Sequence, residues 1–111
     1  MKVYARSAAR DDILRQYRYY LIEKDTALVA ERFLDAVEAA FDAVSSHPLM
    51  GTPKLLENPL LAGLRSWPVP GFKAVRIYHI HSGNQVRILR VLHGKRDVNA
   101  LLEDESAAGE E

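Results

Sequence analysis

The stretch KAVRIYHIHSGNQVRILRVLH, residues 73–93, decides the fold of this chain. Its two halves, 73–81 and 85–93, are rich in Val and Ile, which favour β-strands. The Ser82-Gly83-Asn84 link between them has the composition of a turn. Two such halves joined by so short a link predict an antiparallel β-hairpin.

The length of the hairpin loop decides which arginines face each other. We expect a three-residue loop from Ser82 to Asn84, in which Arg76 pairs with Arg90; a two-residue Gly83-Asn84 loop shifts the register by one residue and separates them. Like charges directly opposite each other destabilise a sheet. The pair therefore either points into solvent or offers a two-pronged site to an anion, because guanidinium groups bind carboxylates and phosphates in bidentate geometry.

Another strand and a loop precede the hairpin. Residues 64–69 predict a strand, in which Pro68 indicates an edge or a bulge because proline has no N–H to donate to a neighbouring strand. Residues 47–60 contain three prolines and a glycine and therefore predict a loop.

Two helices precede this loop. Residues 27–46 show the strongest helical periodicity of the chain, and residues 8–24 predict a second helix, with Ser7 as its N-cap. Asp11 and Asp12 are expected near the first turn of that helix, where the helix dipole favours acids. The apolar face of the 27–46 helix is formed by Val29, Phe33, Ala36, Val37, Ala40, Phe41 and Val44.

These elements predict an α+β fold with the order β-α-α-β-β-β. Residues 2–6 alternate between polar and apolar and predict the first strand. The short link between the helices predicts an antiparallel helical hairpin, which packs on a three- to four-stranded antiparallel sheet in a two-layer sandwich. A short helical turn is expected over 97–103. We expect one domain over 1–102 and an acidic, flexible tail over 103–111.

Composition excludes several classes of protein. A chain of 111 residues has the length of a single domain, and it contains no cysteine, which excludes a disulfide scaffold, a thiolate metal site and a cysteine nucleophile. No apolar run is long enough to span a membrane, and the first residues lack a signal-peptide core. We therefore expect a soluble, cytoplasmic protein.

The net charge of zero hides an uneven distribution. Residues 58–96 hold seven Lys and Arg and no acid, whereas residues 103–111 hold five acids and no base. A basic segment of this length has no local carboxylates to neutralise it. It therefore needs solvent, the acids of the helices or an anionic partner.

The histidines do not indicate a metal site. His79 and His81 have the spacing that puts two imidazoles on one face of a strand, but no acid lies nearby to complete a site. We therefore expect neither metal nor cofactor.

His93, at the end of the last strand, is followed by Gly94-Lys95-Arg96-Asp97. This strand end offers a possible proton-transfer group beside basic residues, and a purely structural role is an equal alternative.

Several segments together resemble the RelE/ParE superfamily of bacterial toxin–antitoxin systems, and within it the ParE-type branch. The resemblance runs from residue 3 to residue 97 and implies a helical hairpin on an antiparallel sheet. The segments that carry it are SAARDDI (7–13), VSSHPLMG (44–51), GLRSWPV (63–69), VRIYH (75–79) and VLHGKRD (91–97).

The resemblance implies a toxin of a type II toxin–antitoxin system. RelE-like members are mRNA endonucleases that act in the ribosome through a lysine pair, arginines and a C-terminal tyrosine, whereas ParE-like members inhibit DNA gyrase without established enzymatic chemistry. Arg76 and Arg96 occupy positions similar to the nuclease arginines. However, residues 64–68 read LRSWP where the lysines are expected, and Leu102 stands about where the tyrosine is. A gyrase inhibitor, not an enzyme, is therefore the favoured interpretation; the alternative is a ribosome-dependent mRNA endonuclease.

The resemblance also implies partners. We expect a cognate antitoxin whose partly apolar, acidic C-terminal segment wraps the toxin and folds on binding, within a higher-order assembly. We expect neither membrane binding nor sequence-specific DNA binding by this chain.

Each residue that is a candidate for function or partner binding also has a structural alternative: Arg65 and Arg76 pair with helix acids such as Asp35 or Asp42, and Trp67 fills the edge of the core. The candidate functional or partner-binding residues are Arg65, Trp67, Arg76, Arg90, His93 and Arg96.

Overall fold

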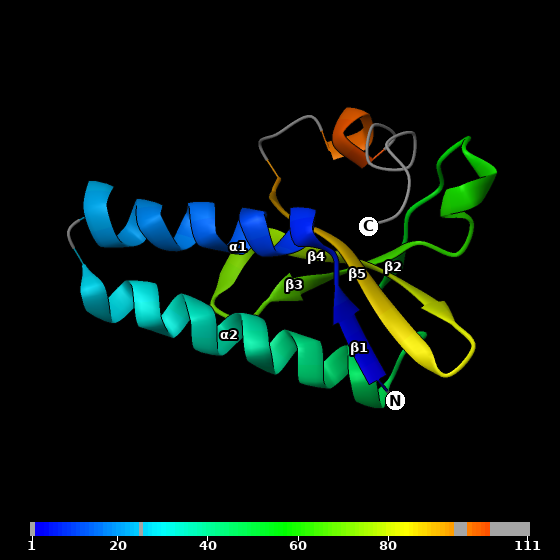
Figure 1. The fold of residues 1–111 in the computed structure, drawn as a ribbon, viewed down its shortest axis with the longest axis horizontal. Helices are drawn as coiled ribbons and strands as arrows, with labels where there is room; N and C mark the ends of the chain where they lie inside the picture. Colours follow the sequence, from blue (N-terminus) through cyan, green and yellow to red (C-terminus); the bar gives the residue numbers. More distant parts are fainter. Residues whose placement is uncertain (1, 25, 95–97, 103–111) are drawn as a thin grey trace.

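The computed structural model describes residues 2–24, 26–94 and 98–102, and within them the predicted order of elements is confirmed (Figure 1). The two helices lie antiparallel and extend past the end of the sheet (Figure 1). The elements are β1 (Lys2–Ala5), α1 (Ser7–Arg18) with a π-helical turn (Tyr19–Glu23), α2 (Ala27–Ser46), β2 (Thr52–Pro53), a 3-10 turn (Pro59–Leu61), β3 (Arg65–Val69), β4 (Phe72–Ser82) and β5 (Gln85–His93).

The sheet has five strands in the order β1-β5-β4-β3-β2. Strands β2 to β5 pair with their neighbours in antiparallel fashion, whereas β1 runs parallel to β5. The α+β class is confirmed, and the sheet is slightly larger than predicted. The additional strand is β2, two residues long, which lies in the segment predicted as a loop. The pairing of β3 with β4 is irregular between Pro68 and Val69, as the proline predicts.

The predicted register of the β4–β5 hairpin is wrong. Ser82 pairs with Gln85, so the loop is the two-residue Gly83-Asn84. Gly83 has a φ of 62°, the left-handed conformation that a tight hairpin turn requires and glycine adopts without strain. A further shift of the register between Tyr78 and His79 then places Arg90 opposite Tyr78, not Arg76.

The start of α1 also differs from the prediction. Arg6 is the N-cap and Ser7 is the first helical residue, so the prediction of Ser7 as the N-cap is wrong. The first turn contains no acid, which places Asp11 and Asp12 farther along the helix than expected. The helix ends in the π-helical turn, where Tyr20 packs against two aromatic rings. Its ring centroid lies 5.5 Å from that of Phe33 and 5.4 Å from that of Phe72.

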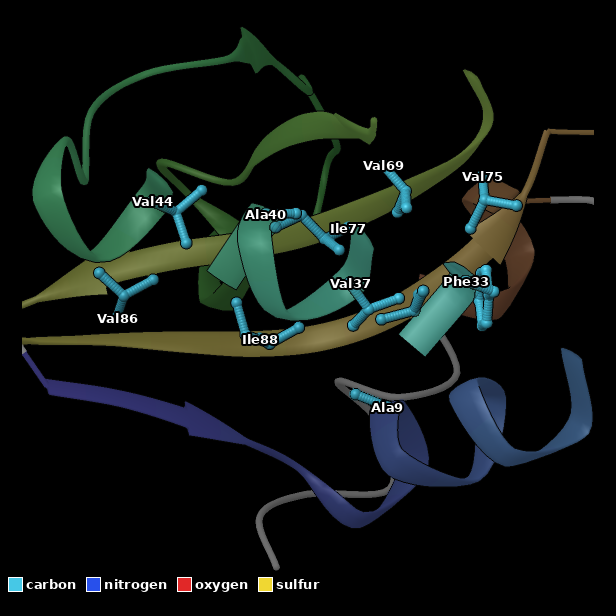
Figure 2. Packing of buried hydrophobic residues seen from close by; sticks show 11 residues of the cluster. Ala9, Phe33, Val37, Ala40, Val44, Val69, Val75, Ile77, Val86 and Ile88 are labelled. Carbon is cyan, nitrogen blue, oxygen red and sulfur yellow. The ribbon is translucent and has the colours of Figure 1, made fainter. Parts of the chain in front are cut away.

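The main hydrophobic core lies between the helices and the sheet. Figure 2 shows side chains of α2 and of strands β3 to β5 filling this space. Successive residues of a strand point to opposite faces, so alternate positions of β4 supply the core. In β5 the alternation is interrupted at Leu89, where the pairing with β4 shifts by one residue. Its buried members are Ala9, Phe33, Val37, Ala40, Val44, Val69, Val75, Ile77, Val86, Ile88 and Val91.

A second, smaller cluster lies on the other face of the sheet. The predicted C-terminal helical turn is present over 98–102, while Asp97, Glu103 and the predicted flexible tail lie outside the described residues. Leu102 is fully buried in this cluster. The sheet is therefore covered on both faces. The buried members of the second cluster are Leu61, Leu64, Tyr78, Leu89, Leu92 and Leu102, with Leu56, Ile80, Val98 and Leu101 packed against them.

Helix α1 completes the edge of β5 where β1 ends. The last pairing of β1 is Ala5 with Ile88, and beyond it α1 crosses the strand. There the Asp12 carboxylate accepts the N–H of Val91 at 3.0 Å, and Gln16 Nε2 donates to the Val91 carbonyl at 2.9 Å. Two helix side chains thus satisfy backbone groups that a continuing strand would otherwise bind.

The same carboxylate neutralises Arg90. Asp12 Oδ2 lies 2.7 Å from Arg90 Nε and Oδ1 lies 2.8 Å from Nη2, a bidentate pair. Asp12 is 0% exposed and Arg90 7% exposed, so solvent cannot replace either partner. The pair joins residues 78 positions apart and fixes α1 on the sheet.

We expect Asp12→Ala to destabilise the fold strongly. The substitution leaves a buried guanidinium without its carboxylate and a strand N–H without its acceptor, a loss of about 3–5 kcal/mol in the free energy of unfolding. Urea unfolding measures it, with Asp11→Ala as the control, because Asp11 is exposed and its loss changes stability by about 0.5 kcal/mol or less. A loss below about 1 kcal/mol for Asp12→Ala would contradict this role.

Candidate functional surfaces on the two faces of the sheet

Arg65 and Trp67 lie on the helix-facing side of β3. Trp67 pairs with Ile77 and packs against the main core, in agreement with the interpretation that it fills the core edge. Arg65 is opposite His79, and its Nη1 donates to the Gly51 carbonyl at 3.1 Å. Both side chains are half-buried.

Arg76 lies on the opposite face of the sheet. Its Nε donates to Ser66 Oγ at 2.9 Å and its Nη2 to the Ser66 carbonyl at 3.3 Å. These bonds tie β4 to β3 through neutral oxygens, in place of the helix acids considered from the sequence. The side chain is half-buried, so part of the guanidinium remains at the surface.

The candidate residues do not gather into one site. Arg90 is held inside the fold by Asp12, and His93 is half-buried at the end of β5, where it pairs with Val75. Arg96 lies outside the described residues. The described candidates are divided between two faces of the sheet, and the expected Arg76–Arg90 anion site is not formed, because the register separates the two residues.

His79 is the unusual residue that the sequence did not single out for function. It is 0% exposed, and neither ring nitrogen has a hydrogen-bond partner among the described residues. Burial, and secondarily the positive charge of Arg65, lower the pKa of His79 from 6.5 to about 4. The imidazole is therefore neutral at physiological pH.

Gly51 makes this close packing possible. Its φ is 97°, and a Cβ on it would lie 2.5 Å from the Ser66 carbonyl oxygen and 3.5 Å from His79 Nε2. A side chain at this position would clash with the backbone of β3. Only glycine therefore fits where the chain passes over Ser66 and His79.

Two further features bear on the kind of site. Within 2–24, 26–94 and 98–102, no three metal-binding side chains gather in a group. In the same part of the chain, no helix combines the length and apolar character that crossing a membrane requires.

We expect His79 to make the fold sensitive to acid. The unfolded chain takes up a proton near pH 6.5 and the folded chain only near pH 4, so the free energy of unfolding falls as the pH is lowered across this interval. The loss is about 3 kcal/mol at most. Urea unfolding of the native protein and of His79→Leu at about pH 7 and about pH 4.5 measures the difference. The control is His47→Gln, at an exposed position, which keeps the native pH dependence; an unchanged pH dependence in His79→Leu would refute the assignment.

Comparison with known proteins places these features in a family. The family of the ParE toxin of type II toxin–antitoxin system, parDE, matches residues 3–98. No curated protein matches the sequence. Among solved structures, a chain of the chromosomal ParDE TA system from P. aeruginosa is similar, with a TM-score of 0.57 and 20% identity over 84% of this chain and 95% of that one.

The two findings support different statements. At 20% identity, the similarity to the P. aeruginosa chain shows a shared fold. The family match covers both helices and all five strands of the described fold except Lys2, the first residue of β1. The chain therefore belongs to the family of ParE toxins of type II toxin–antitoxin systems.

Proposed function

We propose that this toxin acts by binding and inhibiting DNA gyrase in the cytoplasm and that a cognate antitoxin neutralises it. The observation that carries the proposal is the family match over residues 3–98. The structure contributes a second argument, which concerns the chemistry that the described side chains can perform.

Cleavage of mRNA requires a general base, a general acid and cationic groups that converge on one phosphate. Here Arg90 is neutralised inside the fold, and Arg65 and Arg76 lie on opposite faces of the sheet. The buried His79 stays neutral. Leu102, which the resemblance places about where the nuclease tyrosine stands, is a buried apolar residue. This dispersal favours a protein that acts by binding.

The surface charges that remain fit an anionic partner. The hydrogen bonds of Arg65 and Arg76 go to neutral oxygens, so no acid of the described residues compensates either positive charge. We propose that the partner-binding surface extends over both faces of the sheet, with Arg65 and Trp67 on one face and Arg76 on the other, together with His93 and Arg96. Arg90 supports it indirectly through Asp12. The antitoxin segment that fits this surface is partly apolar and acidic, and the complex forms a higher-order assembly.

The proposal predicts stoichiometric inhibition of gyrase. Purified toxin at a molar amount comparable to gyrase stops supercoiling of relaxed plasmid, whereas a translating ribosome supplied with the toxin shows no codon-positioned cuts in its mRNA. Cuts in ribosome-bound mRNA together with unaffected supercoiling would reverse the assignment.

An Arg76→Gln variant tests whether Arg76 contributes to gyrase inhibition. The substitution removes a half-buried charge whose bonds are to a single serine, so we expect weaker inhibition and a change in stability of about 1 kcal/mol or less. Arg32→Gln is the matched control, because Arg32 is an exposed arginine on α2. Equal inhibition by both variants would remove Arg76 from the proposed surface.

The antitoxin is tested by co-expression. We expect the product of an adjacent small reading frame to co-purify with the toxin and to restore growth of cells that express it. Its C-terminal segment alone should gain structure on binding, which circular dichroism detects. Absence of a stable complex, together with harmless expression of the toxin alone, would contradict the proposal.

A further inference from the structure

The outer face of the helical hairpin is the side of α1 and α2 that points away from the sheet. The core residues of the two helices, such as Ala9, Phe33 and Val37, lie on the opposite side. Both helices extend past the end of the sheet (Figure 1). Residues three, four and seven positions apart share one face of a helix, so the exposed residues of each helix form a stripe along the outer face.

The stripe on α2 is acidic. Four exposed acids follow one another at intervals of four, three and four residues: Glu31, Asp35, Glu38 and Asp42. Their like charges repel each other along the helix, and the only base of α2 is Arg32. This acidic stripe therefore favours a cationic partner.

The stripe on α1 is basic and partly apolar. Arg15 and Arg18 are exposed; beside them, Leu14 is 48% exposed and Ile22, in the π-helical turn, is 67% exposed. An open hollow of about 330 Å³ lies on this stripe, and its described lining residues are Asp11, Leu14, Arg15 and Arg18. We call these five residues the basic stripe, in which Asp11 is the only acid.

Neither stripe is neutralised within the chain. In the part of the chain that the structure describes, Arg18 and the four acids of α2 take part in no ion pair. Arg15 Nη1 lies 3.2 Å from Asp12 Oδ1, but Asp12 also binds Arg90, and the Arg15 side chain is 57% exposed. Both stripes can therefore bind charged groups of another molecule.

The two stripes carry opposite charges at matching heights along the hairpin. The ring centroids of Tyr20 and Phe33 lie 5.5 Å apart, so these two residues are level on the antiparallel helices. Because every residue of a helix adds the same rise, positions equally far from Tyr20 and Phe33 are also level with each other. Arg18 is therefore level with Asp35.

We propose that the outer face of the hairpin binds a second copy of this chain, with α1 of each copy lying on α2 of the other. A two-fold axis along the helices produces this arrangement and keeps the heights unchanged, so Arg18 of each copy faces Asp35 of the other. By the same count, Arg15 faces Glu38. The two hairpins then form a four-helix bundle with the two sheets on its outer sides.

The charges select this arrangement over the alternative one. A two-fold axis across the helices would place α2 on α2, so the two acidic stripes would face each other. Like charges brought together in this way oppose binding. Every copy of the chain carries both complementary stripes, and we therefore assign the face to a second copy rather than to a different protein.

Apolar residues supply the attraction between the copies, and the charges fix their orientation. Leu14 and Ile22 of α1 and its π-helical turn lose exposed surface in the bundle, as do Leu28 and Leu34 of α2, which are 63% and 38% exposed. None of the residues that we assign to the partner-binding surface lies on either stripe. The proposal therefore does not rest on gyrase or on the antitoxin.

Sedimentation equilibrium of the full-length protein tests the proposal. We expect the native chain to dimerise with a dissociation constant of about 100 μM or lower. Arg18→Glu and Asp35→Arg each raise this constant about tenfold or more, because each variant alone places like charges together at two contacts. An equimolar mixture of the two variants restores dimerisation, because in the mixed dimer every substituted residue faces a residue of opposite charge.

A third variant changes affinity in the opposite direction. Asp11 lies nine positions before Tyr20 and Asp42 nine positions after Phe33, so these two acids face each other in the dimer. We expect Asp11→Lys to tighten the dimer about threefold or more.

The controls make the same charge changes at exposed positions outside the hairpin. Lys73→Glu and Glu57→Arg are expected to keep the native dissociation constant within about twofold. A native protein that remains monomeric overturns the proposal, and so does a mixture of Arg18→Glu and Asp35→Arg that associates no more tightly than either variant alone. If Arg18→Glu does not fold, Asp35→Arg and Asp11→Lys decide the question, and equal dissociation constants for both and the native chain overturn it.

Discussion

The carboxylate of Asp12 is the group on which the arrangement of helices and sheet depends. It binds both nitrogens of the Arg90 fork and the N–H of Val91, so one side chain neutralises a buried cation and satisfies an open strand edge. Burying two charges costs desolvation energy that their attraction offsets only with good geometry. The bidentate contact supplies that geometry, and it fixes the position at which α1 packs along β5.

This interaction changes how the basic segment 58–96 is understood. From the sequence, its seven positive charges need solvent, the acids of the helices or an anionic partner. In the fold, Arg90 pairs with an acid 78 residues away, whereas Arg65 and Arg76 bind carbonyl and hydroxyl oxygens among the described residues. The described fold therefore neutralises Arg90 internally and leaves Arg65 and Arg76 as surface charges that a partner can bind.

Patterns within single segments of the sequence predicted the helices and strands. Interactions between segments far apart in the sequence could not be predicted. The apolar periodicity predicts α2, and its end at Ser46 agrees with Pro48, because proline disfavours helical geometry in the residue before it. The hairpin register was wrong because turn geometry outweighed what was inferred from the loop's composition, and the shift between Tyr78 and His79, which skips Leu89, has no sequence signature. The roles of Asp12 and His79 depend on residues from other elements, which no local pattern reveals.

The parallel pairing of β1 with β5 has a consequence for synthesis of the protein. Lys2 pairs with Gln85 and Ala5 with Ile88, so the first strand made must wait for the last. Non-local pairing of this kind slows folding, and at a translation rate of about 5–20 residues per second the wait lasts several seconds. During that interval the sheet of the nascent chain is incomplete, because β1 lacks its partner strand. In a cell that makes this toxin, most of the polypeptide is therefore synthesised several seconds before its folded surface can form. The topology of the chain sets the length of this delay.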